Sequence, residues 1–365
     1  MQVVNGGTEK GQKVPQSDDE KRQLEEAYEK ARAQQRAKEA QEKAQRLNDA
    51  DEKALDRIET PLEHLTFAPV WFANFSLPHS DGTPAKKDML ALPQKEMELI
   101  NGNRKLTLIS RAGLPSGVIA RKFLFWITTE TLKQKNMPSD LGCYVPVKSL
   151  RSIMKDMNIS PSTGQRGTYR TLRSQMNRVL KLSYYEDDIS SDDIDGFSNH
   201  HIAEKAFFEW NRKTEDDIDL LEGSHIIVDK NFFLEIAEHG AVPLDKRILS
   251  KLKRSPLAYD FYVWLTYRFY NQTTYTRVTF DQLYRQFATG YPDTKQGHRH
   301  FKAKAEAAFI KVFQAWEEVT GTAPAAALIG NGILLRPEGK PSVPKKAIQQ
   351  IVESVQEPPT NEPPF

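Results

Sequence analysis

The stretch that decides the fold is residues 252–270, LKRSPLAYDFYVWLTYRFY. After a basic, proline-containing start, apolar residues recur four positions apart, at Leu257, Phe261, Leu265 and Phe269. This spacing is typical of one face of a helix, and an aromatic stripe at helical spacing usually packs into a core. The stretch also contains charged residues and is shorter than the ~20 apolar residues that a bilayer span needs. We therefore predict a buried core helix, and neither a membrane segment nor a cofactor site.

An earlier segment repeats this pattern. Residues 120–128, ARKFLFWIT, match residues 258–266, AYDFYVWLT, with Ala, Phe, Trp and Thr at the same four positions of nine. In each copy a short β-type segment and a second helix follow. Pro146 suits the first turn of that helix in the first copy, and Thr279 with Gln282 predicts a capping box in the second. A turn and a longer basic helix come next, at residues 168–182 and 298–316.

Strand-like sequence ends each copy of the repeat. The first copy has residues 182–188, 205–213 and 225–233, and the second has a hairpin in residues 326–339 that turns at Asn331–Gly332. Helix, strand, helix, turn, basic helix and hairpin is the order of a winged helix-turn-helix. The predicted fold class is therefore α+β, with two tandem winged helix-turn-helix domains, a charged N-terminal arm and a Pro-rich C-terminal tail.

Length and composition set the domain plan. A chain of 365 residues suggests about two domains plus tails. We predict a charged helical or disordered arm at residues 1–60, a first winged-helix domain at 61–240, a second at 241–340 and a disordered tail at 341–365. The arm has strong helix propensity but no sustained heptad seam. A dimerising coiled coil is the alternative interpretation of the arm.

The charge of the chain is segregated along the sequence. The formal net charge is only +2, but residues 17–58, 186–195 and 215–222 together hold 23 acidic residues and 10 basic ones. Outside these segments 41 basic residues stand against 26 acidic ones. This excess is the electrostatic footprint of a protein that binds a polyanion.

Cysteine content and the N-terminal sequence indicate the compartment. The single cysteine, Cys143, excludes an internal disulfide and a multi-cysteine zinc site. The first residues, MQVVNGGTEKGQKVPQ, lack the apolar region of a signal peptide. We therefore expect a cytoplasmic protein that has no membrane partner.

The basic helix of the first copy contains the first set of candidate DNA contacts. In a helix-turn-helix the second helix enters the major groove, and the planar fork of Arg matches guanine or a phosphate. Residues 163–181 contain no acid and carry an apolar stripe on the opposite face. The predicted DNA contacts are Arg166, Tyr169, Arg170, Arg173, Arg178 and Lys181, with Gln175 as a further candidate. The alternative is a basic face that only meets solvent.

The second copy and the connector supply further basic residues. The basic helix of the second copy offers Lys295, His298, Arg299, Lys302 and Lys304, with Gln296 and His300 beside them. The connector between the copies offers Lys246, Arg247, Lys251, Lys253 and Arg254. We expect this connector to lie over phosphates if both copies engage one face of a duplex.

Patterns that would indicate an enzyme are weak. The pair His298 and His300 has Arg299 between its members and lies on a predicted helix, and His200–His201 has no spacer and lies in a predicted polar loop. Residues 191–202 resemble a calcium loop, but its first and last positions are Ser191 and Ile202, which are not the required ligands. No phosphate-binding GxxxxGK[ST] motif occurs. The sequence thus predicts no catalytic site, no metal and no cofactor.

Residues 242–268, VPLDKRILSKLKRSPLAYDFYVWLTYR, resemble the plasmid-encoded RepA replication initiator family. The resemblance rests on the Pro-Leu-Asp start, the basic run, Ser-Pro-Leu-Ala and an aromatic helix that ends Trp-Leu-Thr-Tyr-Arg, and it extends less sharply over roughly residues 60–340. It implies tandem winged-helix units that bind repeated origin sequences in double-stranded DNA. It also implies opening of an AT-rich region, recruitment of the host initiator and the replicative helicase, and in many members a homodimer that represses its own promoter. A bacterial protein associated with the nucleoid or a plasmid is implied in the same way.

The sequence is therefore interpreted as a non-enzymatic initiator of plasmid replication. Two alternatives remain open at this point. One is a winged-helix transcriptional repressor of a plasmid or phage operon. The other is a replication nuclease that uses a Tyr and the histidines.

Overall fold

The protein is described by a computed structural model that covers residues 62–81, 94–134, 142–162, 164, 167–190, 196–212, 218–220 and 223–343. The predictions for the arm at 1–60, for Arg166 and for residues 191–195 of the acidic segment lie outside these residues. The described residues belong to one compact unit.

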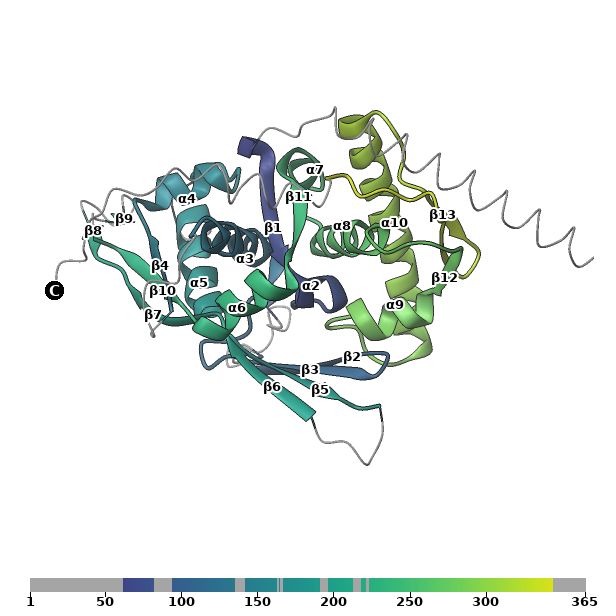
Figure 1. Cartoon of the computed structure of the whole chain (residues 1–365), viewed down its shortest axis with the longest axis horizontal. Helices are drawn as coiled ribbons and strands as arrows, with labels where there is room; N and C mark the ends of the chain where they lie inside the picture. Colours follow the sequence, from purple (N-terminus) through teal and green to yellow (C-terminus); the bar gives the residue numbers. More distant parts are fainter. Residues whose placement is uncertain are drawn as a thin grey trace, which may run out of the picture. The chain divides into compact units, whose positions relative to one another are not determined.

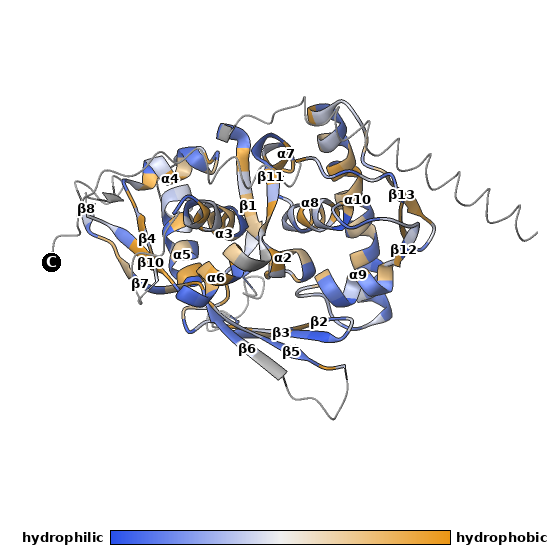
Figure 2. Cartoon of the chain, in the orientation of Figure 1, coloured by the Kyte–Doolittle hydropathy of each residue, from blue (hydrophilic) through white to orange (hydrophobic). Residues whose placement is uncertain are grey.

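Each copy of the repeat begins with a buried helix. Helix α3 (Gly117–Leu132) opens the first half and α8 (Pro256–Phe269) opens the second (Figure 1). On α8, Phe261 and Leu265 are fully buried and Trp264 is only 3% exposed, so the predicted core helix is confirmed. Phe261 stacks on Phe309, with ring centroids 3.9 Å apart. Figure 2 shows hydrophobic residues along α3 and α8, as their burial requires.

The first half continues from α3 with two further helices and several strands. These are β4 (Cys143–Pro146), α4 (Leu150–Asp156), α5 (Thr168–Leu180), β5 (Ser183–Asp188), β6 (Gly196–His201), β7 (Ala203–Phe207), β8 (Trp210–Arg212), β9 (Ile218–Leu220), β10 (His225–Val228) and α6 (Lys230–His239). Strands β4, β10 and β7 form an antiparallel sheet in the order β4-β10-β7, and β8 pairs with β9.

The second half repeats the order of helix, strand, two helices and hairpin. After α8 come β12 (Thr276–Thr279), α9 (Phe280–Phe287), α10 (Lys295–Thr320), β13 (Ala326–Ile329) and β14 (Gly332–Leu335). The sheet order is β12-β14-β13, and all its pairs are antiparallel. The capping box at the start of α9 is confirmed, because Thr279 Oγ1 accepts from the Gln282 N–H at 3.2 Å and Gln282 Oε1 accepts from the Thr279 N–H at 2.8 Å.

Further elements were not predicted from the sequence. They are η1 (Leu62–His64), β1 (Leu65–Pro69), α2 (Val70–Asn74), β2 (Glu96–Asn101), β3 (Arg104–Ile109), β11 (Ala241–Asp245) and α7 (Lys246–Lys251). Strand β1 pairs with β11, which directly precedes the second half, and β2-β3-β5-β6 form a four-stranded antiparallel sheet. The mixture of helices with antiparallel sheets confirms the α+β class.

Two local predictions about helix and hairpin ends are wrong. Pro146 ends strand β4, and the N-cap of α4 is Ser149, whose Oγ accepts from the Ser152 N–H at 3.0 Å. The last hairpin turns at Gly330–Asn331, because Gly332 already pairs with Ile329. Strand β12 passes so near that a Cβ on Gly332 would lie 2.1 Å from the Val278 carbonyl oxygen.

Three longer segments also differ from prediction. The strand expected at 225–233 ends at Val228, because Asp229 caps α6 by accepting from the Asn231 N–H at 2.8 Å. His200 and His201 lie on strand β6, which pairs with β5, and not in a polar loop. The expected tail boundary at 341 is too early, because Ser342 accepts or donates a 2.8 Å hydrogen bond with the Tyr262 hydroxyl and Val343 is fully buried.

Among the described residues, no helix is both long and apolar enough to cross a membrane.

Candidate nucleic-acid interface

Helix α5 has one buried face and one exposed basic face. The buried face contains Leu172, Met176 and Val179, which pack against the rest of the first half. Gln175 also points inward, since it is 7% exposed and its Oε1 accepts from the Ser116 N–H at 2.9 Å. The prediction that Gln175 contacts DNA is therefore wrong.

The outward face of α5 contains part of the predicted set of contacts. Arg170 and Lys181, which follows the helix directly, are exposed. Arg173 is half-buried, and its guanidinium lies over the Trp210 ring at 4.2 Å from the centroid. The Tyr169 hydroxyl accepts from Arg151 Nε at 3.2 Å. Helix α5 itself contains no acid, so Arg170, Arg173 and Lys181 give its outward face a positive charge.

Arg178 occupies a different environment from the other basic residues of α5. Its guanidinium pairs with the Asp81 carboxylate and donates to the Leu114 carbonyl oxygen at 3.2 Å. The side chain is only 11% exposed. Arg178 thus ties α5 to the segment before β2, and DNA would reach its guanidinium only if that pair opened.

The N-terminal part of α10 presents a second exposed basic surface. Thr294 caps the helix by accepting from the Gly297 N–H at 3.1 Å, and a Cβ on Gly297 would lie 1.9 Å from the Pro292 carbonyl oxygen. Among the predicted contacts, Lys295, Arg299 and Lys304 are exposed. Lys302 instead donates to the Gly330 carbonyl oxygen at 2.8 Å, which ties α10 to the last hairpin.

His298 is held between two carboxylates at the start of α10. Its ring stacks on Tyr284 with centroids 3.7 Å apart. Its Nε2 lies 2.9 Å from Asp293 Oδ1 and its Nδ1 lies 3.4 Å from Asp281 Oδ1. The hydrogen bond with Asp293 is the main reason that the pKa of His298 is raised.

The predicted basic connector is mostly folded into the protein. Lys246 donates to the Glu63 carbonyl oxygen at 3.1 Å, and its burial lowers the pKa of its amine. Arg247 pairs with Asp245 at 2.6 Å, and Lys251 pairs with Glu318. Only Lys253 and Arg254 are exposed. The connector is therefore not a continuous basic strip, because β11 and α7 organise its first half.

Lys253 and Arg254 lie at a basic groove with walls from both halves. The groove has a volume of about 670 Å³. Its lining is Val118, Ile119, Lys122, Asn158, Ile159, Ser250, Lys253, Arg254, Tyr259 and Lys311. The first five come from α3 and the turn after α4, and the last five from α7, α8 and α10 with their connections.

Among the residues that the structure describes, no acidic one lines this groove, whereas Glu63, Glu130 and Asp156 line a neighbouring pocket of about 230 Å³. Lys122 Nζ donates to the carbonyl oxygens of Met157 and Asn158, both at 2.9 Å, and burial lowers its pKa to about 8. The sequence analysis missed Lys122 and Lys311. Only Lys311 had a sequence signal, because it follows Lys304 by two helical turns on a basic helix.

The histidine signals do not assemble into a metal site. Within the described ranges, no group of three or more His, Cys, Asp or Glu side chains is placed to hold a metal ion. His200 stacks on the buried Tyr184, with ring centroids 4.9 Å apart, and its Nδ1 lies 3.6 Å from Glu235 Oε2.

Comparisons with known families give a match to one part of the described chain. Residues 118–282 match the family model described as Plasmid encoded RepA protein. This segment begins on α3 and ends on α9, so it contains α5 and the connector. Residues 3–65 match the model described as Plasminogen-binding protein pgbA C-terminal, almost wholly outside the described residues. No curated protein matches the chain.

Among solved structures, domains 2 and 3 of RctB are similar at 13% identity, with a TM-score of 0.45, covering 74% of this chain and 99% of the RctB chain. A second structure of RctB domains 2–3 is similar at 10% identity, with a TM-score of 0.38, covering 72% of this chain and 93% of that chain.

Proposed function

We propose that the chain, whose residues 118–282 match the family model described as Plasmid encoded RepA protein, initiates plasmid replication by binding repeated origin sequences in double-stranded DNA. Each half acts as a winged helix-turn-helix, with α5 and α10 as the recognition helices. The role is non-enzymatic and uses no cofactor. Origin opening, recruitment of the host initiator and helicase, and a homodimer that represses its promoter are part of the proposal through the family resemblance.

The observation that carries this proposal is the distribution of exposed basic residues. They occur on α5, on the N-terminal part of α10 and in the acid-free groove with walls from both halves. DNA presents one negative charge per ~1.7 Å of helix axis, and in this proposal a duplex that contacts both helices also passes over the groove. In this proposal Arg170 and Arg299 contact base edges or phosphates, and Lys253 and Arg254 contact the intervening backbone.

Footprinting of the purified protein on its own plasmid tests the proposal and locates the site. We expect Arg170→Ala and Arg299→Ala each to weaken specific binding by ~1–3 kcal/mol if the residue reads a base. Arg104→Ala is the matched control, because Arg104 is exposed but lies 3.6 Å from Glu186 on the β2-β3-β5-β6 sheet. Unchanged affinity in both test variants would refute the assignment of the recognition helices.

Two further assays separate initiation from the alternatives. Permanganate reactivity in the AT-rich region should rise when the protein is added to supercoiled origin DNA. A repressor would bind its site without this reactivity. A nuclease would nick the supercoiled DNA, and any nicking by the purified protein would contradict the non-enzymatic role.

A further inference from the structure

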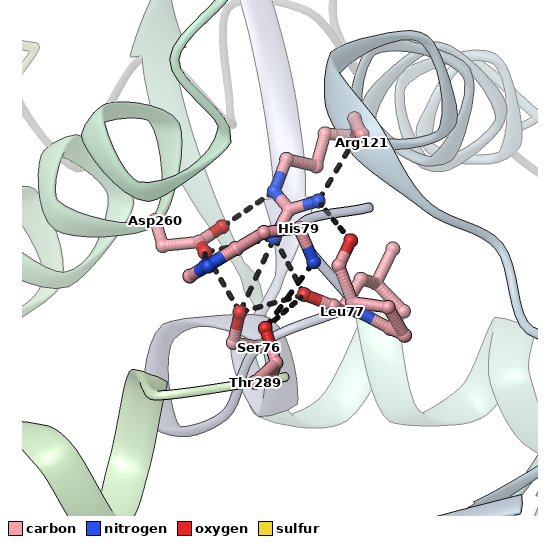
Figure 3. Close-up of polar contacts among 8 residues, drawn as sticks. Ser76, Leu77, His79, Arg121, Asp260 and Thr289 are labelled. Carbon is pink, nitrogen blue, oxygen red and sulfur yellow. Dashed lines mark hydrogen bonds and ion pairs between the residues drawn. The ribbon is translucent and has the colours of Figure 1, made fainter. Parts of the chain in front are cut away.

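A buried ion pair joins the two halves of the protein. Arg121 lies on α3 of the first half and Asp260 on α8 of the second. Arg121 Nε lies 2.7 Å from Asp260 Oδ1, and Arg121 Nη2 lies 2.8 Å from Asp260 Oδ2 (Figure 3). Both side chains are 0% exposed. The contact is therefore bidentate and shielded from solvent.

Every N–H of the Arg121 guanidinium has an acceptor. Besides the two bonds to Asp260, Nη1 donates to the carbonyl oxygens of Pro78 at 3.1 Å and Gly117 at 3.0 Å, and Nη2 donates to the Leu77 carbonyl oxygen at 2.7 Å. An Arg side chain has five donors in a fixed fork. The position of the Arg121 guanidinium is thus determined by α3 and by the segment that contains Leu77 and Pro78. A guanidinium held in this position can pair with the Asp260 carboxylate in one orientation.

The carboxylate of Asp260 is also fully engaged. It accepts from the Ser76 hydroxyl at 2.7 Å and from His79 Nε2 at 3.1 Å (Figure 3). Burial by itself would raise the pKa of Asp260, but the Arg121 charge and hydrogen bonds outweigh it and the pKa is lowered. Burial lowers the pKa of His79, so its ring is neutral near pH 7 and donates to the carboxylate.

This pair is a departure from the sequence repeat. In the aligned segments Arg121 corresponds to Tyr259, and Asp260 corresponds to Lys122. The two copies therefore differ at the positions through which they contact each other. A buried ion pair is poor evidence for stability, because apolar residues of similar volume often do as well, and its best attested role is to select one arrangement among several.

The arrangement of the halves determines where the two proposed recognition helices lie. Helix α3 packs against α5, and α8 packs against α10. A rotation of α8 relative to α3 would therefore move α10 relative to α5. Strands β1 and β11 also join the halves through backbone hydrogen bonds, so loss of the ion pair would change the angle between the halves without separating them.

We propose that the Arg121–Asp260 pair fixes the placement of α10 relative to α5 and thereby sets the spacing between the two DNA segments that the protein reads. Arg121 and Asp260 are positioning residues, since neither is accessible to DNA. This inference rests on the proposed function, in which both helices contact one duplex.

The first test uses DNA in which the spacer between the two footprinted segments is changed. Inserting about 5 bp moves one segment half a helical turn around the duplex. We expect the parent protein to lose about tenfold or more in affinity with each wrong spacer, which corresponds to ~1.4 kcal/mol. The double variant Arg121→Met with Asp260→Leu removes both charges and leaves no unpaired buried charge. It should bind all spacers within about threefold and bind a single segment as the parent does.

The control variant is Lys105→Met with Asp187→Leu, which removes a 3.2 Å ion pair inside the β2-β3-β5-β6 sheet. It should keep the spacer preference of the parent. Asp260→Asn, which retains the shape of Asp260, should show an intermediate preference. If the double variant folds cooperatively and keeps the preference of the parent, the proposal is wrong.

The second test needs no DNA and separates this inference from the proposed function. Spin labels at Thr171→Cys on α5 and Ala307→Cys on α10 occupy exposed positions, and the native Cys143 is buried. The distance distribution between the labels should be narrow in the parent and shifted or broadened in the double variant. An unchanged distribution would refute the positioning role, even if the protein binds no DNA. A changed distribution with an unchanged spacer preference would refute the role in DNA spacing.

Discussion

The protein should lose stability as the pH rises through neutrality, because Glu235 must ionise. Replacing Glu235 with Gln should remove this loss. Glu235 lies on α6, and its carboxylate accepts from the hydroxyl of the buried Tyr184. The Glu235 side chain is 13% exposed, and His200 Nδ1 lies 3.6 Å from it. Burial raises its pKa from 4.5 to about 7, against the hydrogen bond from Tyr184, and the charge of Glu186 adds to the increase.

The sign and size of the effect follow from proton linkage. Between the unfolded pKa of 4.5 and the folded pKa of about 7, the folded protein binds more protons than the unfolded chain. Stability from this group is therefore full below 4.5 and is lost as the pH rises through about 7. The pKa shift corresponds to about 3 kcal/mol of the free energy of unfolding in total. The protein should lose ~2–3 kcal/mol of this between pH 5 and pH 8.

Urea unfolding of the parent and of Glu235→Gln at about pH 5 and pH 8 measures this difference. Gln keeps an oxygen that accepts from Tyr184 but does not ionise. The free energy of unfolding of the variant, relative to the parent, should increase by ~2–3 kcal/mol between the two pH values. Glu204→Gln, at an exposed position on β7, is the control and should show no such change. An equal difference at both pH values would show that Glu235 does not titrate in this range.

Three other outcomes are expected. Trp264→Ala should destabilise the protein by ~3–5 kcal/mol, the range for truncation of a buried aromatic residue, and DNA binding should fall only as the folded fraction falls; normal unfolding with abolished binding would place Trp264 at an interface. If 6–10 phosphates are contacted, affinity for DNA should decrease ~10³–10⁵-fold between 50 and 200 mM salt, and a nearly flat titration would argue against the basic surface. Deletion of residues 1–58 should leave the affinity for the specific site within a few-fold in a binding titration, whereas loss of site recognition would show that the arm takes part.

The sequence by itself determined the elements whose signal is local. The helical spacing of apolar residues in 257–270 predicted a buried helix, and Phe261 and Leu265 are fully buried. The repeat between 120–128 and 258–266 predicted that α3 and α8 begin equivalent halves. The Thr279–Gln282 capping box was also predicted, because its two partners are three residues apart and fold with the helix that they cap.

Only the tertiary structure decided which basic and polar residues remain exposed. Arg178, Arg247 and Lys251 pair with carboxylates, and Gln175 is buried beside Ser116. The sequence does not show which basic residues find a carboxylate in the fold. Gln175 lies three residues after Leu172 and four before Val179, on the buried face of α5. Strands β2 and β3 form a local hairpin that turns at Gly102–Asn103 and was overlooked in the sequence. Only the pairing of β3 with β5, about 80 residues later, depends on the tertiary structure.

The ion pair between the halves is the clearest case of a contact that a sequence pattern does not reveal. Arg121 and Asp260 are 139 residues apart in sequence, and each is a charged residue on a helix that is mostly apolar. A buried charge is tolerated only where a partner and hydrogen bonds compensate it. A buried charged residue on α3 or α8 therefore indicates that a partner exists. Only the packing of the two halves brings the Arg121 guanidinium and the Asp260 carboxylate together.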